Sequence, residues 1–298
     1  MATLYTQQSK NVHKTWLLVG VFLVIVLGIG YFTSIYFGNP DILTIAIIFS
    51  IAMNIAGYWY SDKIALSLAG AVEADTISFR ELHNIVENLA ITAGLPKPKV
   101  WIIEDTAPNA FATGRNAKHA SVAVTTGLLA LLNKSELEGV VAHELAHIGN
   151  RDILLQSMVA VLVGFIALLS DMLMRSFLWG GMRRSDDDSR GSGGVLMIVG
   201  LVFIILSPII ATLIQLAISR KREFLADASG ALLTRYPEGL AAALEKISSY
   251  HAPMLRTSNA TAHMYIANPF GDGGKKITRL FMTHPPVEER IKALLENK

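Results

Sequence analysis

The amino-acid sequence predicts a mainly helical α+β protein that crosses a membrane several times, and three observations support this fold class. Hydrophobic side chains make up 52% of the 298 residues and charged side chains only 17%, whereas ordinary soluble domains contain about 25% charged residues. The apolar residues gather in four long blocks, and two polar stretches with helix and strand patterns hold most of the rest. Cysteine is absent and the formal net charge is +2, which excludes a disulfide framework and gives no support for a nucleic-acid-binding protein.

The first two apolar blocks predict an N-terminal transmembrane hairpin over residues 1–60. Residues 16–37 and 42–60 contain no charged side chain, and each block is close to the roughly 20 helical residues that span a bilayer core. The tight turn Asn39-Pro40-Asp41 joins them. A cleaved signal peptide is the alternative, but the first block is too long for a signal core and a second span follows directly.

The charges around this hairpin predict its orientation. Lys10 and Lys14 precede the first block and Lys63 follows the second, while the turn between the blocks carries only Asp41. Because basic residues favour the cytoplasmic side of a membrane, we expect both flanks of the hairpin, and the polar stretches, to face the cytosol.

The third and fourth apolar blocks predict a second hairpin over residues 153–218, which we expect to be transmembrane. Residues 195–218 carry no charge, and Pro208 predicts a kink within them. Residues 153–170 are mostly apolar but are followed closely by Asp171. A buried soluble helix or a re-entrant pair is therefore the alternative for this region.

The first polar stretch, residues 61–152, predicts a small sheet flanked by helices. Ser78 and Glu81 have the spacing of a capping box at the start of a helix that ends near Ala93. Two segments rich in Val and Ile are expected to be strands, and the segment between them is expected to be an edge strand or a loop. In chain order, the first strand, the intervening segment and the second strand cover residues 99–104, 107–115 and 120–125.

The last helix of this stretch begins at a second capping-box pattern, Ser135 with Glu138. It runs through Ile148 and can continue into the third apolar block. On a continuous helix, His147 lies about 9 Å from Ile153, because each residue rises 1.5 Å. We therefore expect a site on this helix to lie close to the membrane surface, on the cytosolic side.

That helix carries the sequence His143-Glu144-Leu145-Ala146-His147. Residues four apart lie on the same helical face, so both imidazoles can reach one metal ion, and zinc prefers such nitrogen ligands. Glu144 is then placed to accept a proton from a water molecule at the metal. The neighbouring side chains are apolar, and burying two histidines and a glutamate among them without a metal would be costly.

A third ligand is needed, and a candidate pair lies in the second polar stretch, residues 219–298, so neither polar stretch is expected to be a separate domain. Glu223 and Asp227 share a helical face, and Glu223 can bind zinc while Asp227 accepts a hydrogen bond from the free ring nitrogen of His143. A solvated acidic face is the alternative, because three basic residues precede Glu223. The competing third ligands are His119, His251, His263 and His284.

Four motifs, in order along the chain, resemble the HtpX group of integral-membrane zinc metalloproteases, which are relatives of the CAAX prenyl endopeptidases. The motifs are Asn109-Ala110-Phe111-Ala112-Thr113, His143 to His147, Glu223 to Asp227, and Thr283-His284-Pro285-Pro286 with Glu289-Arg290. The resemblance implies one zinc ion per chain in a gluzincin-type site, with His143, His147 and Glu223 as ligands. It also implies a location in the bacterial cytoplasmic (inner) membrane.

The resemblance further implies roles for other residues. Glu144 would act as the general base, and Asp227 would support a ligand histidine. His284 would stabilise the oxyanion, and Arg290 would order the segment around it. The edge strand that pairs with an extended substrate would contain Asn109, Ala110, Phe111 and Ala112.

These expectations describe a membrane-bound zinc endopeptidase that cleaves membrane proteins or their cytosolic segments, in membrane protein quality control. A catalytically inactive membrane scaffold that contains zinc is one alternative, but such a protein would usually lack Glu144. A prenyl-peptide processing protease is another, but the small polar part leaves less room for an enclosed chamber. A zinc transporter would need His or Asp within its spans, and the two N-terminal spans contain neither.

The remaining patterns predict no further chemistry. Gly271-Asp272-Gly273-Gly274 lacks the Lys-Ser/Thr ending of a P-loop, so no nucleotide site is expected. The last residues predict a short helix with Glu288, Glu289, Arg290 and Lys292 solvated. His13, His83, His251 and His263 are interpreted as surface or packing residues.

Overall fold

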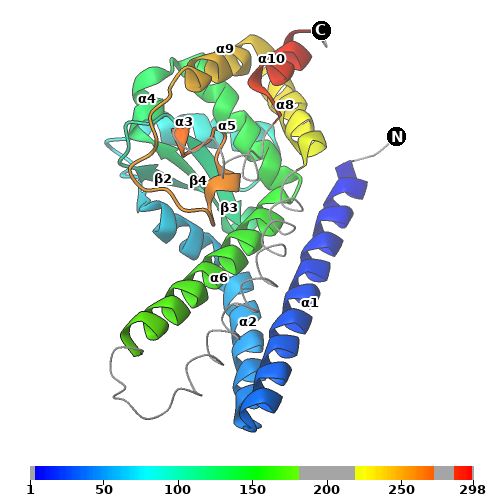
Figure 1. Cartoon of the computed structure of the whole chain (residues 1–298). Coiled ribbons are helices and arrows are strands. Elements are labelled where there is room, and N and C mark those ends of the chain that lie inside the picture. Colours follow the sequence, from blue (N-terminus) through cyan, green and yellow to red (C-terminus); the bar gives the residue numbers. More distant parts are fainter. Residues whose placement is uncertain (1–3, 181–218, 272–284, 297–298) are drawn as a thin grey trace.

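The structure, a computed structural model, describes residues 4–180, 219–271 and 285–296. Within these ranges, three long helices extend from one end of a globular part, in which helices surround a four-stranded sheet (Figure 1). The first of these helices begins beside the globular part and runs away from it, and the second returns to it.

Helices α1 (Leu4–Phe37) and α2 (Asp41–Ala69) form the expected N-terminal hairpin. Their segments Asn11–Tyr36 and Asp41–Ala69 are long and apolar enough to cross a membrane, and only 17% and 11% of their most apolar windows is buried inside the protein. Large apolar side chains such as Val24 and Phe32 therefore cover the outside of the hairpin. A surface of this kind is unfavourable in water and suits contact with lipid.

The third apolar block forms α6 (Asp152–Gly180), which packs alongside α1 and α2 (Figure 1). Leu18 and Phe22 of α1 meet Leu155 and Leu162 of α6 in a buried apolar cluster. The fourth block, residues 195–218, lies outside the described residues, as do residues 181–194 before it.

The helix does not continue into the third apolar block, a continuation that the sequence left open. Helix α5 (Lys134–Gly149) ends before that block, and the chain turns by 85° into α6. Arg151 has a left-handed backbone with φ 58°, and the amide groups of Asn150 and Arg151 donate to the carbonyls of Ala146 and Ile148. A left-handed residue closes a helix end in this way, most often as glycine, and the chain then leaves in a new direction.

The sheet has the strand order β1-β2-β4-β3. The strands are β1 (Val72–Glu73), β2 (Lys99–Ile103), β3 (Ala110–Gly114) and β4 (Ala120–Thr125). β2 and β4 are parallel, and β3 is antiparallel to β4 with Ala112 opposite Val122. β3 is therefore an edge strand, which is the first of the two interpretations of residues 107–115.

Helix α5 is the centre of the globular part, because it contacts the sheet and the helices α3, α8 and α9. The helices around it are α3 (Arg80–Thr92), α4 (Thr126–Leu131), α8 (Arg220–Thr234), α9 (Pro237–Ser248) and α10 (Val287–Glu296). Gly139 lets α9 approach α5 closely, since a Cβ atom at Gly139 would lie 2.7 Å from the backbone nitrogen of Leu240.

The capping boxes expected at Ser78 and Ser135 are wrong. α5 is capped by Asn133, whose side chain accepts a hydrogen bond from the amide of Glu136, while the Glu136 carboxylate accepts one from the amide of Asn133. α3 begins without a side-chain cap, and the carboxylate of Asp75 accepts hydrogen bonds from two amides in the preceding turn. Asn and Asp compete with Ser for such positions, so spacing alone did not identify the capping residue.

One apolar core joins the two polar stretches of the sequence. Val122 and Val140 come from the first stretch, and Leu240, Leu244 and Leu294 come from the second. The strands, α5, α9 and α10 therefore share one core.

Candidate active site

Helix α5 places His143, Glu144 and His147 in the protein interior. The two histidines are one helical turn apart, so their rings lie together. Their Nε2 atoms are 3.1 Å apart, and the ring planes are nearly perpendicular, at 89°.

Helix α8 brings Glu223 to the same place. Gly230 allows α8 to lie close to α5, because a Cβ atom there would lie 3.0 Å from the backbone nitrogen of His143. The two carboxylate oxygens of Glu223 then lie 3.7 Å from Nε2 of His143 and 3.7 Å from Nε2 of His147. Sequence reasoning missed Gly230, although its place seven residues after Glu223, on the same helical face, was an available signal.

The donor atoms of His143, His147 and Glu223 fit a metal ion. One ligand atom of each lies within 4.8 Å of the others, in the part of the chain that the structure describes. Tetrahedral coordination at about 2.1 Å puts ligand atoms about 3.4 Å apart, which is close to the observed spacings. Each histidine uses Nδ1 to contact another carboxylate, so two Nε2 lone pairs and a carboxylate converge in a buried space. Such acceptors repel one another unless a cation lies between them.

The other histidines considered as third ligands do not join this group. His119 and His251 are exposed, and the buried ring of His263 places Nε2 3.0 Å from the carbonyl oxygen of Gln156. His284 lies outside the described residues. Among the described side chains, Glu223 is the one that completes the group.

On the far side of His143, Asp227 and Arg290 form a buried ion pair. Nδ1 of His143 lies 2.9 Å from a carboxylate oxygen of Asp227. Arg290 donates to both oxygens of that carboxylate, from Nε at 2.8 Å and from Nη2 at 2.6 Å. Burial raises the pKa of Asp227, but the hydrogen bonds and charge of Arg290 outweigh burial and hold this pKa at about 2. Asp227 is therefore a carboxylate at neutral pH and can fix the ring of His143.

Arg290 corrects one expectation from the sequence. It was expected to be solvated on α10, but its side chain is 0% exposed. A buried guanidinium requires a paired carboxylate, and Asp227 supplies it. Nη2 of Arg290 also lies 3.5 Å from Nδ1 of His143. The described contacts of Arg290 are therefore with His143 and with Asp227, the carboxylate beside it.

The partner of His147 is Asp152, which sequence reasoning missed. A carboxylate oxygen of Asp152 lies 2.9 Å from Nδ1 of His147. Five residues separate the two, and on a continuous helix they would lie on different faces. The helix break at Arg151 brings Asp152 back towards His147. The available signal was a single acidic residue at the start of a long apolar block.

Asn11 and Arg222 hold Asp152 in turn. Asn11, near the start of α1, is buried and donates from Nδ2 to Asp152 at 2.6 Å and to the carbonyl of Asn150 at 3.1 Å. Nη1 of Arg222 donates to the side-chain oxygen of Asn11 at 3.4 Å, and Nε of Arg222 lies 3.7 Å from Asp152. The first membrane helix is therefore hydrogen-bonded to the residue that contacts His147.

The charges around His147 raise its pKa. Burial alone lowers this pKa, but the negative charge of Glu223 and the hydrogen bond with Asp152 outweigh burial and raise it to about 9. In the metal-free protein, the ring of His147 is therefore a positively charged imidazolium at neutral pH. Nδ1 of His147 faces Asp152, and Nε2 faces His143 and Glu223. The positive charge of the ring therefore lies among the same acceptor groups that could hold a metal ion.

Glu144 lies next to the metal-binding group without belonging to it. Its side chain is buried, and its negative charge acts on both His147 and Arg290. A buried carboxylate in this position is suited to accept a proton from a bound water molecule.

The residues expected to bind substrate, Asn109 to Ala112, lie at β3 and are buried. Asn109 is engaged by a distant segment, because its side chain accepts a hydrogen bond from the amide of Ala267 and donates one to the carbonyl of the same residue. Phe111 packs against Tyr265, with ring centroids 5.0 Å apart. These two residues therefore hold residues 265–267 against the sheet, which the sequence did not reveal.

The outer edge of β3 is occupied at its two ends. The amide of Ile266 donates to the carbonyl of Ala110, and the amide of Gly114 donates to the hydroxyl of Ser157 on α6. Because backbone groups alternate along a strand, the amide and carbonyl of Ala112 face the same edge. No described residue hydrogen-bonds to them there.

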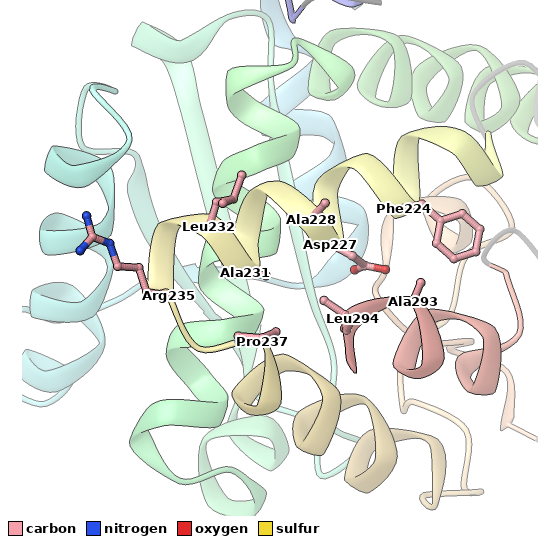
Figure 2. A pocket seen from close by; sticks show the side chains of 9 residues that line it. All are labelled: Phe224, Asp227, Ala228, Ala231, Leu232, Arg235, Pro237, Ala293 and Leu294. Atoms are coloured by element: carbon pink, nitrogen blue, oxygen red, sulfur yellow. The ribbon is translucent and has the colours of Figure 1, made fainter. Parts of the chain in front are cut away.

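A pocket of about 610 Å³ lies between α8 and α10 (Figure 2). Apolar side chains line most of it, among them Phe224, Leu232 and Leu294, and Asp227 reaches it from α8. The three metal-binding residues do not line it. The pocket therefore borders Asp227, which contacts His143, and is separate from the metal-binding group.

The sequence profile of peptidase family M48 matches residues 76–298. The chain belongs to peptidase family M48. Relatives named "Protease HtpX homolog" match it over nearly their whole length. The relative from Thermoanaerobacter pseudethanolicus is 52% identical over 295 residues, covering 98% of this chain and 97% of the relative. The relative from Dictyoglomus turgidum is 44% identical over 293 residues, covering 98% and 94%.

A solved structure, that of S. mikatae Ste24p, shares the fold with a TM-score of 0.50 and 19% sequence identity, over 99% of this chain and 67% of that one. Membership of family M48 makes this chain a metalloprotease with a metal cofactor, and His143, His147 and Glu223 are the described group that can hold one. The two long apolar helices make it a membrane protease.

Proposed function

We propose that this M48 protein is a zinc-dependent endopeptidase of the gluzincin type in a bacterial cytoplasmic membrane. The observation that carries the proposal is the buried group of His143, His147 and Glu223, in which each histidine contacts a further carboxylate through Nδ1. Zinc is the proposed metal, because two imidazoles and one glutamate are a known ligand set of catalytic zinc sites with an open fourth position.

The side chains around the group have separate tasks in this proposal. A zinc ion held by the two histidines and the glutamate would supply a Lewis acid and a water molecule of lowered pKa. Glu144 accepts a proton from the attacking water and later donates it to the leaving amine. Asp227 and Asp152 keep Nδ1 of each ring engaged, so the Nε2 lone pairs face the metal position. Arg290 keeps Asp227 ionised and in place.

The proposed substrate is an extended polypeptide segment that adds to the sheet at β3. The amide and carbonyl of Ala112 at the outer edge of β3 support this placement, which requires the segment bonded to Ala110 to move away, because Ala112 is buried. Pairing of this kind relies on main-chain hydrogen bonds and selects little among side chains. His284 is the proposed donor to the developing oxyanion, and replacing His284 by Ala should lower kcat much more than it changes KM.

The proposed membrane arrangement has two hairpins, residues 1–60 and 153–218, and a catalytic part made of residues 61–152 and 219–298 that faces the cytosol. The hydrogen bond from Asn11 to Asp152 supports a metal site near the membrane surface, because Asn11 is the first residue of the first apolar span. A site at that level favours membrane proteins and their cytosolic segments as substrates. Removal of damaged membrane proteins is the proposed role.

The test of this function uses the full chain in detergent, stripped of metal with a chelator and then reloaded with zinc. Cleavage of casein or a membrane protein should require zinc. The Glu144→Gln variant should keep its zinc and lose about 100- to 10,000-fold in turnover, as expected for loss of a general base. Glu138→Gln on the same helix is the matched control and should keep its activity. Undiminished turnover by zinc-loaded Glu144→Gln would remove Glu144 from its proposed role.

The orientation can be tested separately, because the chain contains no cysteine. Asn39→Cys places one thiol in the turn between α1 and α2, and Lys134→Cys places one at the start of α5. A membrane-impermeant maleimide should label the first variant in intact cells and the second only after the cells are permeabilised. The reverse pattern would contradict a cytosolic site.

A further inference from the structure

A pocket of about 700 Å³ lies where α2 meets the globular part. It is lined by the end of α2, by the first residues of β2 and by the turn between β3 and β4. No residue of the metal-binding group lines it, so the pocket is separate from the proposed chemistry.

The pocket lies at the level where membrane head groups are expected. Trp59 lies 18 residues after Asp41, the first residue of α2, and on a helix this is about 27 Å. The hydrocarbon core of a bilayer is about 30 Å thick. Trp59 and Tyr60 are 52% and 54% exposed, and such amphipathic rings settle at the membrane–water interface. The residues that follow Tyr60 on α2, and the pocket that they line, therefore lie at the level of the head groups, outside the hydrocarbon core.

The pocket is rich in positive charge. Five Lys or Arg side chains line it, against two acidic side chains, Asp62 and Glu73. The cationic residues are Lys63, Lys97, Lys99, Arg115 and Lys118. They come from three segments that are separated in sequence, so the fold gathers the charge and a local run of basic residues does not explain it.

Arg115 is held in place at the entrance. Its guanidinium lies 4.5 Å from the centre of the Trp59 ring, and Nη1 donates to the carbonyl oxygen of Trp59 at 3.2 Å. The ammonium of Lys63 lies 5.6 Å from the centre of the Tyr60 ring. Stacking fixes the plane of the guanidinium and leaves other N–H groups available, because the one hydrogen bond to Trp59 uses only one of its five donors.

The remaining cations differ in how far they are neutralised. Lys97 pairs with Glu87 at 2.6 Å, so it contributes less to the field in the pocket. Lys99 and Lys118 are exposed, and no ion pair of either is found in the described ranges of the chain. The pocket therefore presents Arg115, Lys99 and Lys118 as the cations best placed to bind an anion.

We propose that this pocket binds the phosphate-bearing head group of an anionic phospholipid from the adjacent bilayer leaflet. Arg and Lys side chains gathered beside a membrane helix attract such lipids, and a guanidinium matches phosphate oxygens with paired N–H donors. The exposed Trp59 and Tyr60 at the rim suit the interface between acyl chains and head groups. An acidic polypeptide would explain the charge but not these two rings. The proposal requires the membrane hairpin and is independent of proteolysis.

Binding can be measured on the full chain in detergent by native mass spectrometry with added phosphatidylglycerol or phosphatidylcholine. The wild type should retain phosphatidylglycerol at least tenfold more tightly than phosphatidylcholine. The double variant Lys99→Gln/Lys118→Gln changes two exposed side chains and should lose most of this preference. Adding Arg115→Gln should abolish it.

The matched control is Arg80→Gln/Lys134→Gln, which removes the same charge from exposed positions of α3 and α5 that do not line the pocket. It should keep the lipid preference, and thermal unfolding of the lysine double variant and of the control should match that of the wild type. Three results would overturn the proposal. They are equal retention of both lipids by the wild type, equal loss in the control, and displacement of phosphatidylglycerol by millimolar inorganic phosphate or by polyglutamate.

Discussion

The two histidines of the metal-binding group are held by different parts of the molecule. His143 contacts Asp227, which is held by Arg290, and all three residues belong to the globular part. His147 contacts Asp152, which is held by Asn11 of the first membrane helix. Each histidine therefore has a carboxylate at Nδ1. The carboxylate beside His143 is held within the globular part, whereas the carboxylate beside His147 is held by a residue of the membrane hairpin.

This difference teaches that the membrane helices contribute to the geometry of the site as well as to anchoring. Without α1, the His143 side would keep all of its described contacts. The His147 side would lose the 2.6 Å hydrogen bond from Asn11 and would keep the longer approach of Arg222, at 3.7 Å. Variants on the two sides, and of Glu223, which both sides share, test this difference.

Glu223 serves both histidines, so its loss should have the largest effect. Glu223→Gln removes the negative charge that faces both Nε2 atoms. Zinc affinity, measured by competition with a chromophoric chelator, should fall by more than the roughly 100-fold expected for a residue that only orients a ligand. Glu245→Gln, an exposed position on α9, should leave the affinity unchanged. A Glu223→Gln variant that binds zinc normally would contradict the assignment of this ligand.

Asp227→Asn should be the most damaging change on the His143 side. It leaves the fully buried Arg290 without its carboxylate, which should cost about 3 kcal/mol of unfolding free energy, and zinc affinity should fall about 100-fold. Because the pKa of Asp227 is lowered from 3.8 to about 2, its contribution to stability is present above pH 3.8 and is lost as the pH falls towards 2. Thermal unfolding of wild type and variant should therefore differ at pH 7 and converge in acid. The exposed change Lys292→Gln is the control.

The His147 side predicts a pH dependence of metal binding. With a pKa of about 9 in the metal-free protein, His147 must lose a proton before Nε2 can bind metal. Zinc affinity should therefore rise about tenfold per pH unit, or about 100-fold between pH 7 and pH 9, after correction for the chelator. Affinity that does not change over this range would contradict a protonated His147.

Asp152→Asn should weaken zinc binding about 10- to 100-fold. It should also lower the pKa of His147, because one of the carboxylates that stabilise the imidazolium is removed. The rise of zinc affinity with pH should then level off at a lower pH than in the wild type, whereas a purely structural defect would not move that pH. Unfolding free energy should fall less than in Asp227→Asn, since Asn11 and Arg222 can still contact the new amide.

Asn11→Ala should have the smallest effect and tests the link to the membrane helix most directly. It removes one hydrogen bond to Asp152, which corresponds to about a 2- to 10-fold loss of zinc affinity. The control is Asn54→Ala in α2, since the amide of Asn54 donates within its own helix to the carbonyl of Ser50. Equal effects of the two variants would show that the His147 side does not depend on α1.

Several features of the fold follow from sequence patterns alone. Uncharged blocks of about 20 residues predicted α1 and α2, and runs of Val and Ile predicted β2 and β4. These predictions succeeded because helix and strand periods are local properties of the chain. The sequence did not locate the break at Arg151, because an apolar run does not reveal a single left-handed residue that ends one helix and starts the next.

By itself the sequence also identified candidate metal ligands, because the spacings His143–His147 and Glu223–Asp227 each place two residues on one helical face, but it left four histidines as alternatives to Glu223. It could not determine what orients them. Asp152 supports His147 only because the chain breaks between α5 and α6, and Arg290 is buried only because α10 brings it to Asp227. The bond from Asn11 to Asp152 joins residues 141 positions apart. Such contacts depend on how whole helices pack, and no local period encodes them.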